Sequence, residues 1–164
     1  MGLSNRRKFI LILLASLFVL SAIITAMNQK SIHLLYPKKI SNVSPSIANE
    51  LILDNEILIL DVRNPEEYDV SHLAKAIRYE PDLVNGLELD TPIVVYCTVG
   101  VRSGKLAKEL QDKGFTNVKN IDLGLINWKN KGFEVVDKNG EPTEKVHVYN
   151  RFFGTWLKKG EGVK

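Results

Sequence analysis

Apolar runs and amphipathic stretches alternate along residues 45–137, as expected for strands and helices in turn. Buried strands are predicted where β-branched and aliphatic residues run together, over residues 56–62, 93–96 and 117–121. A short strand is predicted over residues 76–79, and residues 133–136 close the compact unit. Apolar positions at helical spacing predict helices over residues 46–53, 105–113 and 125–131. Near-continuous apolar strands are typical of a parallel sheet covered on both faces, so we expect an α/β fold.

A different pattern occupies the N-terminus, where residues 9–26 contain no charge, proline or glycine. Three basic residues precede this run, at positions 6–8. A basic cluster followed by an apolar run is typical of an export signal or a membrane anchor, and this run is just long enough to cross a bilayer. Because the cleavage site is poor, we expect an uncleaved hydrophobic helix, with cleavage and secretion as the alternative.

The basic cluster also predicts an orientation. It favours a cytoplasmic N-terminus, which would put the folded domain outside the cytoplasm, on the periplasmic side of a bacterium. The predicted organisation is a signal-anchor or signal peptide, a linker, one folded domain and a C-terminal extension, over residues 1–27, 28–44, 45–137 and 138–164.

Charge and histidine placement restrict the possible partners. Of 22 basic and 19 acidic residues, three basic ones lie in residues 1–27, so the remainder is formally neutral with 19 of each. A neutral body lacks the basic surface of a nucleic-acid-binding protein, and we expect no nucleic-acid partner. The three histidines are scattered and no phosphate-binding or dinucleotide-binding fingerprint occurs, so we expect no metal and no cofactor.

Cys97 is the only cysteine of the chain and its strongest candidate for chemistry. It lies between the strand over 93–96 and the helix over 105–113, where backbone N–H groups lack helical partners and favour an anion. Such a setting favours the thiolate, which is the nucleophilic form of cysteine. The alternative is a small buried hydrophobic side chain, and the glycine-containing turn argues against it.

The spacing from Cys97 to Arg102 restricts the chemistry further. The loop is Cys-X4-Arg, one residue shorter than the Cys-X5-Arg loop of cysteine phosphatases. A phosphate group needs a wider ring of amides than one sulfur atom does. The shorter loop therefore suits a single sulfur and disfavours phosphatase or arsenate reductase activity.

These motifs, taken together, resemble the rhodanese-like sulfurtransferase domain. The resemblance spans about residues 40–136 and rests on five stretches in the family's order: LDVRNPEEY (60–68), SHLAKAI (71–77), VYCTVGVRS (95–103), LGLINW (123–128) and GFEV (132–135). It implies a rhodanese-like parallel sheet flanked by helices and a persulfide on Cys97. The chain departs from the family at four turn positions that are usually glycine or proline: Ser71, Ala74, Lys75 and Leu123.

The resemblance also implies roles within the active-site loop. Backbone amides would cradle the terminal sulfur of the persulfide, along Thr98, Val99, Gly100, Val101, Arg102 and Ser103. Arg102 is expected to stabilise the thiolate or receive an anionic donor. Ser103 is expected to cap the helix and also lend its hydroxyl to the sulfur, with capping alone as the alternative. Asp61 and Arg63 are expected to brace the loop, and His72 to be a residue of the fold rather than a base.

The C-terminal extension lies outside the resemblance. Its aromatic residues fall at helical spacing, at Tyr149, Phe152, Phe153 and Trp156. This face either packs on the domain, which we favour, or rests on a membrane surface.

The sequence thus predicts a membrane-anchored or exported thiosulfate sulfurtransferase. Thiosulfate or a persulfide would be the donor, and cyanide, a thiol or a protein the acceptor. The alternative is a non-catalytic module of the same fold that docks an envelope protein. A third possibility is a redox-responsive thiol.

Overall fold

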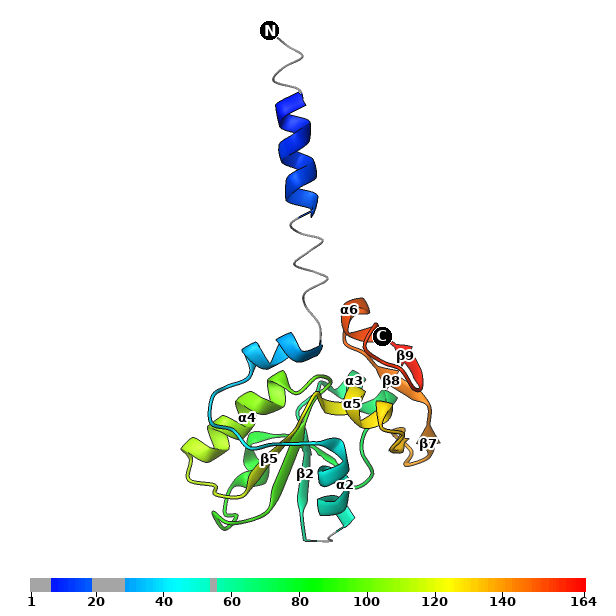
Figure 1. Cartoon of the computed structure of the whole chain (residues 1–164). Helices are drawn as coiled ribbons and strands as arrows, with labels where there is room; N and C mark the ends of the chain where they lie inside the picture. The colour runs from blue at the N-terminus through cyan, green and yellow to red at the C-terminus, as the bar shows by residue number, and fades with distance from the viewer. Residues whose placement is uncertain (1–6, 19–28, 54–55) are drawn as a thin grey trace. The chain divides into compact units, whose positions relative to one another are not determined.

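The computed structural model describes residues 7–18, 29–53 and 56–164. The chain separates into two units, Met1–Leu34 and Leu35–Lys164. The second unit contains a five-stranded sheet in which all neighbouring strands run parallel (Figure 1). From edge to edge its strands are β1 (Asn42–Val43), β5 (Val118–Ile121), β4 (Ile93–Tyr96), β2 (Leu58–Asp61) and β3 (Ile77–Arg78). The predicted parallel α/β fold is confirmed.

Successive side chains along each strand point to opposite faces of the sheet, and they form two apolar layers, one on each face. Val94 and Tyr96 of β4 belong to one buried cluster, while Ile93 and Val95 belong to the other. This follows from the two-residue period of a strand, which turns successive side chains to opposite faces. Because both faces are buried, the strands read as continuous apolar runs in the sequence.

Helices cover both layers (Figure 1). α4 (Val101–Asp112) contributes Leu106, Ala107 and Leu110 to the cluster around Val95. α2 (Pro45–Leu53) and α5 (Gly124–Asn130) contribute Ala48 and Trp128, among others, to the cluster around Tyr96. α4 begins one turn before the predicted helix over 105–113, so its N-terminus directly follows the Cys97 loop.

Shorter elements complete the second unit. α3 (Pro65–Val70) begins at a capping box in which Asn64 and Glu67 satisfy each other's backbone N–H groups. A 3-10 helix, η2 (Pro81–Val84), follows β3, and another, η1 (Gln29–Leu35), begins in the first unit and ends at the first residue of the second. β1 lies within residues 28–44, so part of the stretch predicted as a linker belongs to the sheet.

The C-terminal extension is folded. β6 (Val135–Val136) pairs with β7 (Pro142–Thr143), and β8 (Lys145–His147) pairs with β9 (Glu161–Val163). Val146 and Val148 join the apolar cluster around Tyr96, so the extension packs on the domain through these valines rather than through the predicted aromatic face. α6 (Arg151–Gly154) is shorter than the aromatic spacing predicts, and only Trp156 of the aromatic set is buried.

The first unit contains a helix over residues 7–18, so the predicted N-terminal helix is present. The predicted membrane anchor over 9–26 is contradicted: within residues 7–18, 29–53 and 56–164, no helix has the length and apolar character needed to span a membrane. Residues 19–26 of the predicted span lie outside the described residues.

Candidate active site

Cys97 begins a buried loop that joins the carboxyl end of β4 to α4. Its side chain is 1% exposed, and the backbone N–H of Gly100 donates to its Sγ at 3.2 Å. Gly100 is the N-cap of α4 and has a φ of 83°. A Cβ at Gly100 would lie 2.0 Å from the hydroxyl oxygen of Tyr36, so both the backbone and the available space require glycine.

Tyr36 holds this loop from a segment that sequence analysis treats as a linker. Its hydroxyl donates to the carbonyl of Val99 at 2.9 Å and accepts from the N–H of Leu123 at 3.0 Å. Burial raises the pKa of Tyr36 above its ordinary value, which keeps the hydroxyl protonated and able to donate. Sequence reasoning missed this residue because a single tyrosine in a polar stretch has no periodic signal.

Two further segments hold the loop through backbone groups. The side-chain amide of Asn120, at the end of β5, donates to the carbonyl of Gly100 at 3.2 Å and to Asn42 of β1 at 2.8 Å. On the other side, the N–H of Leu125 donates to the carbonyl of Cys97 at 2.8 Å. The loop is thus tied to β5 and to the start of α5, and Asn120 is itself bonded to β1.

Leu123 replaces a usual family glycine and takes the conformation that glycine would supply. Its φ is 55°, in the left-handed region, and it is the N-cap of α5. Lys75, at another departure from the family, has a φ of 65°. The backbone therefore keeps these two turns, and the L-residues bear a conformational cost of about 1 kcal/mol each.

Glu67 is a buried carboxylate that bonds two residues of the Cys97 segment. Its oxygens accept from both terminal nitrogens of Arg102, each at 2.7 Å, and from the hydroxyl of Thr98 at 2.8 Å. The backbone N–H of Asn64 donates to it at 3.2 Å. Sequence analysis includes Glu67 in the motif over residues 60–68 but not in the site, and the capping-box spacing from Asn64 is the signal that could have drawn attention to it.

The charges of Glu67 and Arg102 stabilise each other. Burial raises the pKa of Glu67, but hydrogen bonds and charge from Arg102 lower it by more, so the pKa lies below its usual value. Burial lowers the pKa of Arg102, but Glu67 and the nearby Cys97 raise it above its usual value. Arg102 is therefore a partly exposed cation already bonded on one side to a carboxylate.

Asp61 and Arg63 form a buried ion pair next to this site. The guanidinium of Arg63 donates to Asp61 through Nε at 2.9 Å and through Nη2 at 2.6 Å, and Nη2 also donates to the carbonyl of Ser71. Burial lowers the pKa of Arg63, but the Asp61 carboxylate raises it by more, so the guanidinium stays charged. Arg63 also lies over the ring of Tyr96, so the pair links the Ser71 turn to the end of β4.

Ser103 lies in the first turn of α4, and its predicted capping role is wrong. The N-cap of α4 is Gly100, because the chain enters the helix with a left-handed residue at that position. Ser103 is fully buried, and within residues 7–18, 29–53 and 56–164 its hydroxyl has no hydrogen-bond partner.

His72 lies in the fold as expected and makes contacts of a structural kind. Its ring stacks on the ring of Tyr68 with centroids 3.8 Å apart, and its Nδ1 lies 3.0 Å from the carbonyl oxygen of Tyr68. Its backbone pairs with Val136. Among the residues that the structure describes, no group of three or more His, Cys, Asp or Glu side chains could hold a metal ion.

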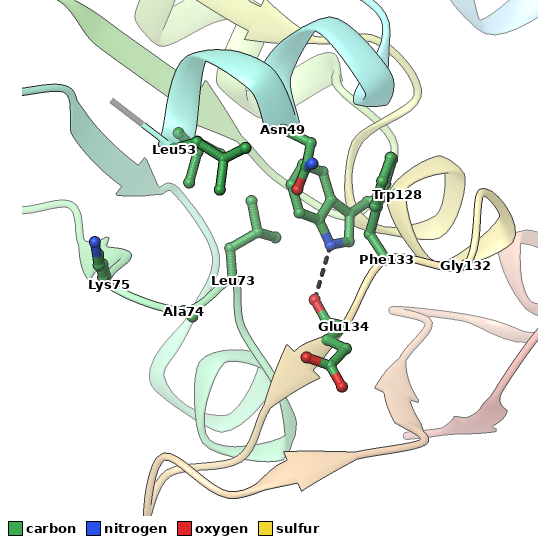
Figure 2. Close-up of a pocket in the computed structure, with 10 residues that line it drawn as sticks. Asn49, Leu53, Leu73, Ala74, Lys75, Trp128, Gly132, Phe133 and Glu134 are labelled. Atoms are coloured by element: carbon green, nitrogen blue, oxygen red, sulfur yellow. Dashed lines mark hydrogen bonds between the residues drawn. The ribbon is translucent and has the colours of Figure 1, made fainter. Parts of the chain in front are cut away.

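A cleft of about 440 Å³ lies apart from the Cys97 loop, between α2, the 73–75 turn and the end of α5 (Figure 2). Trp128 forms one wall, and its indole N–H donates to the carbonyl of Glu134 at 2.9 Å. None of residues 97–103 is among the residues that line this cleft.

The curated relatives are named as tRNA hydroxylases, whereas the similar solved structures are named as rhodanese-related or sulfur-transfer proteins. The chain is 35% identical over 98 residues to the tRNA uridine(34) hydroxylase of Pelagibacter ubique, covering 56% of this chain and 33% of that protein. It spans between a third and two fifths of the length of the first curated relatives that it matches.

Two solved structures are also similar. A rhodanese-related protein from Thermoplasma volcanium is 27% identical with a TM-score of 0.50, covering 58% of this chain and 97% of that chain. The polysulfide-sulfur transferase homodimer of Wolinella succinogenes is 25% identical with a TM-score of 0.52, covering 72% of this chain and 90% of that chain.

These relatives correct two predictions about the surroundings of the domain. The predicted location outside the cytoplasm depended on the membrane anchor, and the curated relatives, whose name refers to a tRNA, contradict it as well. The same name conflicts with the exclusion of nucleic-acid partners, which rested on net charge alone.

The family itself follows from the match over the domain core. Residues 44–131, more than half of the chain, match the family described as the Rhodanese-like domain. This family supports a sulfur-related, transferase-like enzyme with a sulfur donor and a sulfur acceptor. With the parallel sheet of the predicted fold and a rhodanese-related structural neighbour, the match shows that the chain belongs to the rhodanese-like domain family.

Proposed function

We propose that this domain is a sulfurtransferase that carries sulfane sulfur as a persulfide on Cys97. In the first step the Cys97 thiolate attacks the outer sulfur of a donor such as thiosulfate. The S–S bond of the donor breaks, sulfite leaves with the bonding electron pair, and Cys97 becomes Cys–S–S⁻. In the second step an acceptor such as cyanide or a thiol attacks the terminal sulfur, and the Cys97 thiolate leaves.

One observation carries this proposal: the N–H of Gly100 donates to Sγ of Cys97 inside a buried loop at the N-terminus of α4. A fixed N–H donor next to a sulfur stabilises negative charge without reorganisation during the reaction. We assign the persulfide cradle to the predicted loop residues, Thr98, Val99, Gly100, Val101, Arg102 and Ser103. The buried hydroxyl of Ser103 is a further donor for the terminal sulfur, and Asp61 and Arg63 support the loop through the end of β4.

The donor class is supported by the family and by one neighbour. The name of the Wolinella succinogenes protein describes transfer of sulfur from polysulfide. We therefore propose a sulfane donor, either thiosulfate or the terminal sulfur of a persulfide or polysulfide. The hydroxylase activity named for the curated relatives is not extended to this chain, which spans less than half of their length. Their name makes tRNA a further candidate partner of this chain.

Intact mass spectrometry of the full chain tests the proposal. After incubation with thiosulfate or glutathione persulfide, we expect a gain of one sulfur atom that cyanide or a thiol removes. The matched control is Cys97→Ser, which keeps the size of the side chain but not its nucleophile, and it should gain nothing. The proposal is overturned if no donor adds sulfur to the parent chain, or if Cys97→Ser gains it equally.

A further inference from the structure

We infer that Tyr149 is a specificity-determining residue of the active site, which selects organic persulfides over thiosulfate as the sulfur donor. The inference rests on the proposed sulfur transfer and names its substrate class. The family match ends at residue 131, and Tyr149 belongs to the extension beyond it. Nevertheless, the ring of Tyr149 lies against Arg102 of the active-site loop.

The fold holds Tyr149 in this position from both sides. β8 packs against α3, and Val148, next to Tyr149, is buried in the apolar core. The N–H of Val148 donates to the carbonyl of Val163, while the side chain of Asn150 caps α6 by accepting from the N–H of Phe153 at 2.9 Å. The Tyr149 backbone is therefore fixed between a strand and a helix start.

The backbone at Tyr149 has an unusual conformation. Its φ is 65°, and the N–H of Asn150 donates across it to the carbonyl of Val148 at 2.7 Å, which closes a γ-turn. A positive φ is uncommon for a bulky side chain and costs free energy, and such residues concentrate at functional sites. The chain thus makes a tight turn at Tyr149, the residue whose ring contacts Arg102.

Arg102 is held between two groups. Its two terminal nitrogens donate to Glu67, each at 2.7 Å, and the centroid of the Tyr149 ring lies 5.1 Å from its Cζ, within cation–π range. The Tyr149 residue is 54% exposed, and the Arg102 side chain 33%. An approaching donor therefore meets an aromatic ring as well as a cation whose charge is already balanced.

This arrangement disfavours a compact dianion. The formal charges of Glu67, Arg102 and a Cys97 thiolate add up to minus one, so the group repels thiosulfate more than it repels the singly charged end of an organic persulfide. The Tyr149 ring keeps the guanidinium on Glu67 and offers apolar contact to the organic part of the donor. The favoured step is Cys97–S⁻ + R–S–S⁻ → Cys97–S–S⁻ + R–S⁻, in which the S–S bond of the donor breaks and its thiolate leaves.

Donor competition kinetics on three full-length chains test this role. The initial rate of sulfur loading is measured with thiosulfate and with glutathione persulfide, for the parent chain, Tyr149→Ala and Tyr149→Phe. All three residues carry a Cβ and so pay a cost for the left-handed backbone. Alanine removes the ring, whereas phenylalanine keeps the ring and removes only the hydroxyl. In Tyr149→Ala we expect the kcat/KM ratio of thiosulfate to persulfide to rise about two- to fivefold, mainly through a lower thiosulfate KM. Tyr149→Phe keeps the ring and should keep the ratio of the parent chain.

The outcomes separate this inference from the proposed function. If neither donor loads the parent chain, sulfur transfer itself is refuted. If both donors load it but Tyr149→Ala leaves the ratio unchanged or lowers it, sulfur transfer stands and the specificity role is wrong. An equal rise in Tyr149→Ala and Tyr149→Phe also refutes the role of the ring. Thermal unfolding of each variant shows whether the fold is retained.

Discussion

Replacing Gly124 by alanine tests how strongly the active-site loop depends on a close backbone approach. Gly124 has a φ of 55°, and a Cβ built on it would lie 2.0 Å from the carbonyl oxygen of Cys97 and 2.8 Å from the carbonyl carbon of Thr98. Both atoms belong to the backbone, so no side chain can rotate away. Either the loop or the start of α5 must move to accept a methyl group.

The magnitude follows from three contributions. The left-handed φ costs an L-residue about 1 kcal/mol. Overpacking against fixed atoms costs about 1–3 kcal/mol, and loss of the 2.8 Å hydrogen bond from Leu125 to the Cys97 carbonyl costs about 1 kcal/mol. We therefore expect Gly124→Ala to lower the free energy of unfolding by about 3–5 kcal/mol. Sulfur loading should fall too, because the displaced carbonyl belongs to Cys97.

Gly140 offers a matched control. Its φ is 82°, but nothing lies within 4 Å of the position that a Cβ would take. Gly140→Ala should therefore cost only the backbone term of about 1 kcal/mol and leave sulfur loading intact. Urea unfolding followed by circular dichroism measures both variants. Equal losses in the two variants would refute the argument, since the steric contribution would then be absent.

Two ionisable pairs lead to further predictions. Because the pKa of folded Glu67 is lowered, its ionisation contributes stability at neutral pH that is lost as the pH falls below about 4.5. Between pH 7 and pH 3 to 4, the urea midpoint should therefore fall less in Glu67→Gln than in the parent chain. An identical fall in both chains would contradict this. Asp61→Asn leaves the buried Arg63 charge without its carboxylate and should cost about 3–5 kcal/mol. Asp61→Leu combined with Arg63→Leu should cost less than Asp61→Asn in the same urea assay, and a larger loss in the double variant would count against a buried charge penalty.

The sheet could be predicted from the sequence because burial on two faces leaves a strong local pattern. β2, β4 and β5 all lie inside the predicted strands, and the switch from apolar run to helical spacing located the Cys97 loop. The predicted helix over residues 105–113 begins one turn after the observed start of α4 at Val101. Val101, Arg102 and Ser103 are helical, although polar residues and a nearby glycine gave that stretch the character of a loop.

The groups that shape the loop could not be predicted, because their contacts are polar and distant in sequence. Tyr36 reaches the backbone of Val99 and Leu123, which are 63 and 87 residues away. Glu67 reaches Arg102, 35 residues away, from a helix whose local pattern explains its role as a cap alone. Neither contact leaves a periodic trace, since each depends on where the fold brings two single residues together.

In the proposed sulfur transfer, reactivity and donor preference have different structural origins. The N–H that donates to Cys97 belongs to the loop itself, within a motif that the sequence displays. Arg102 is held instead by Glu67 of α3 and contacts Tyr149 beyond the family match. A chain with the same loop but a different extension would keep the nucleophile and its amide donor while losing the aromatic ring at the mouth. On this reasoning, the loop motif identifies the nucleophile, and the contacts around Arg102 determine which sulfur donors reach it.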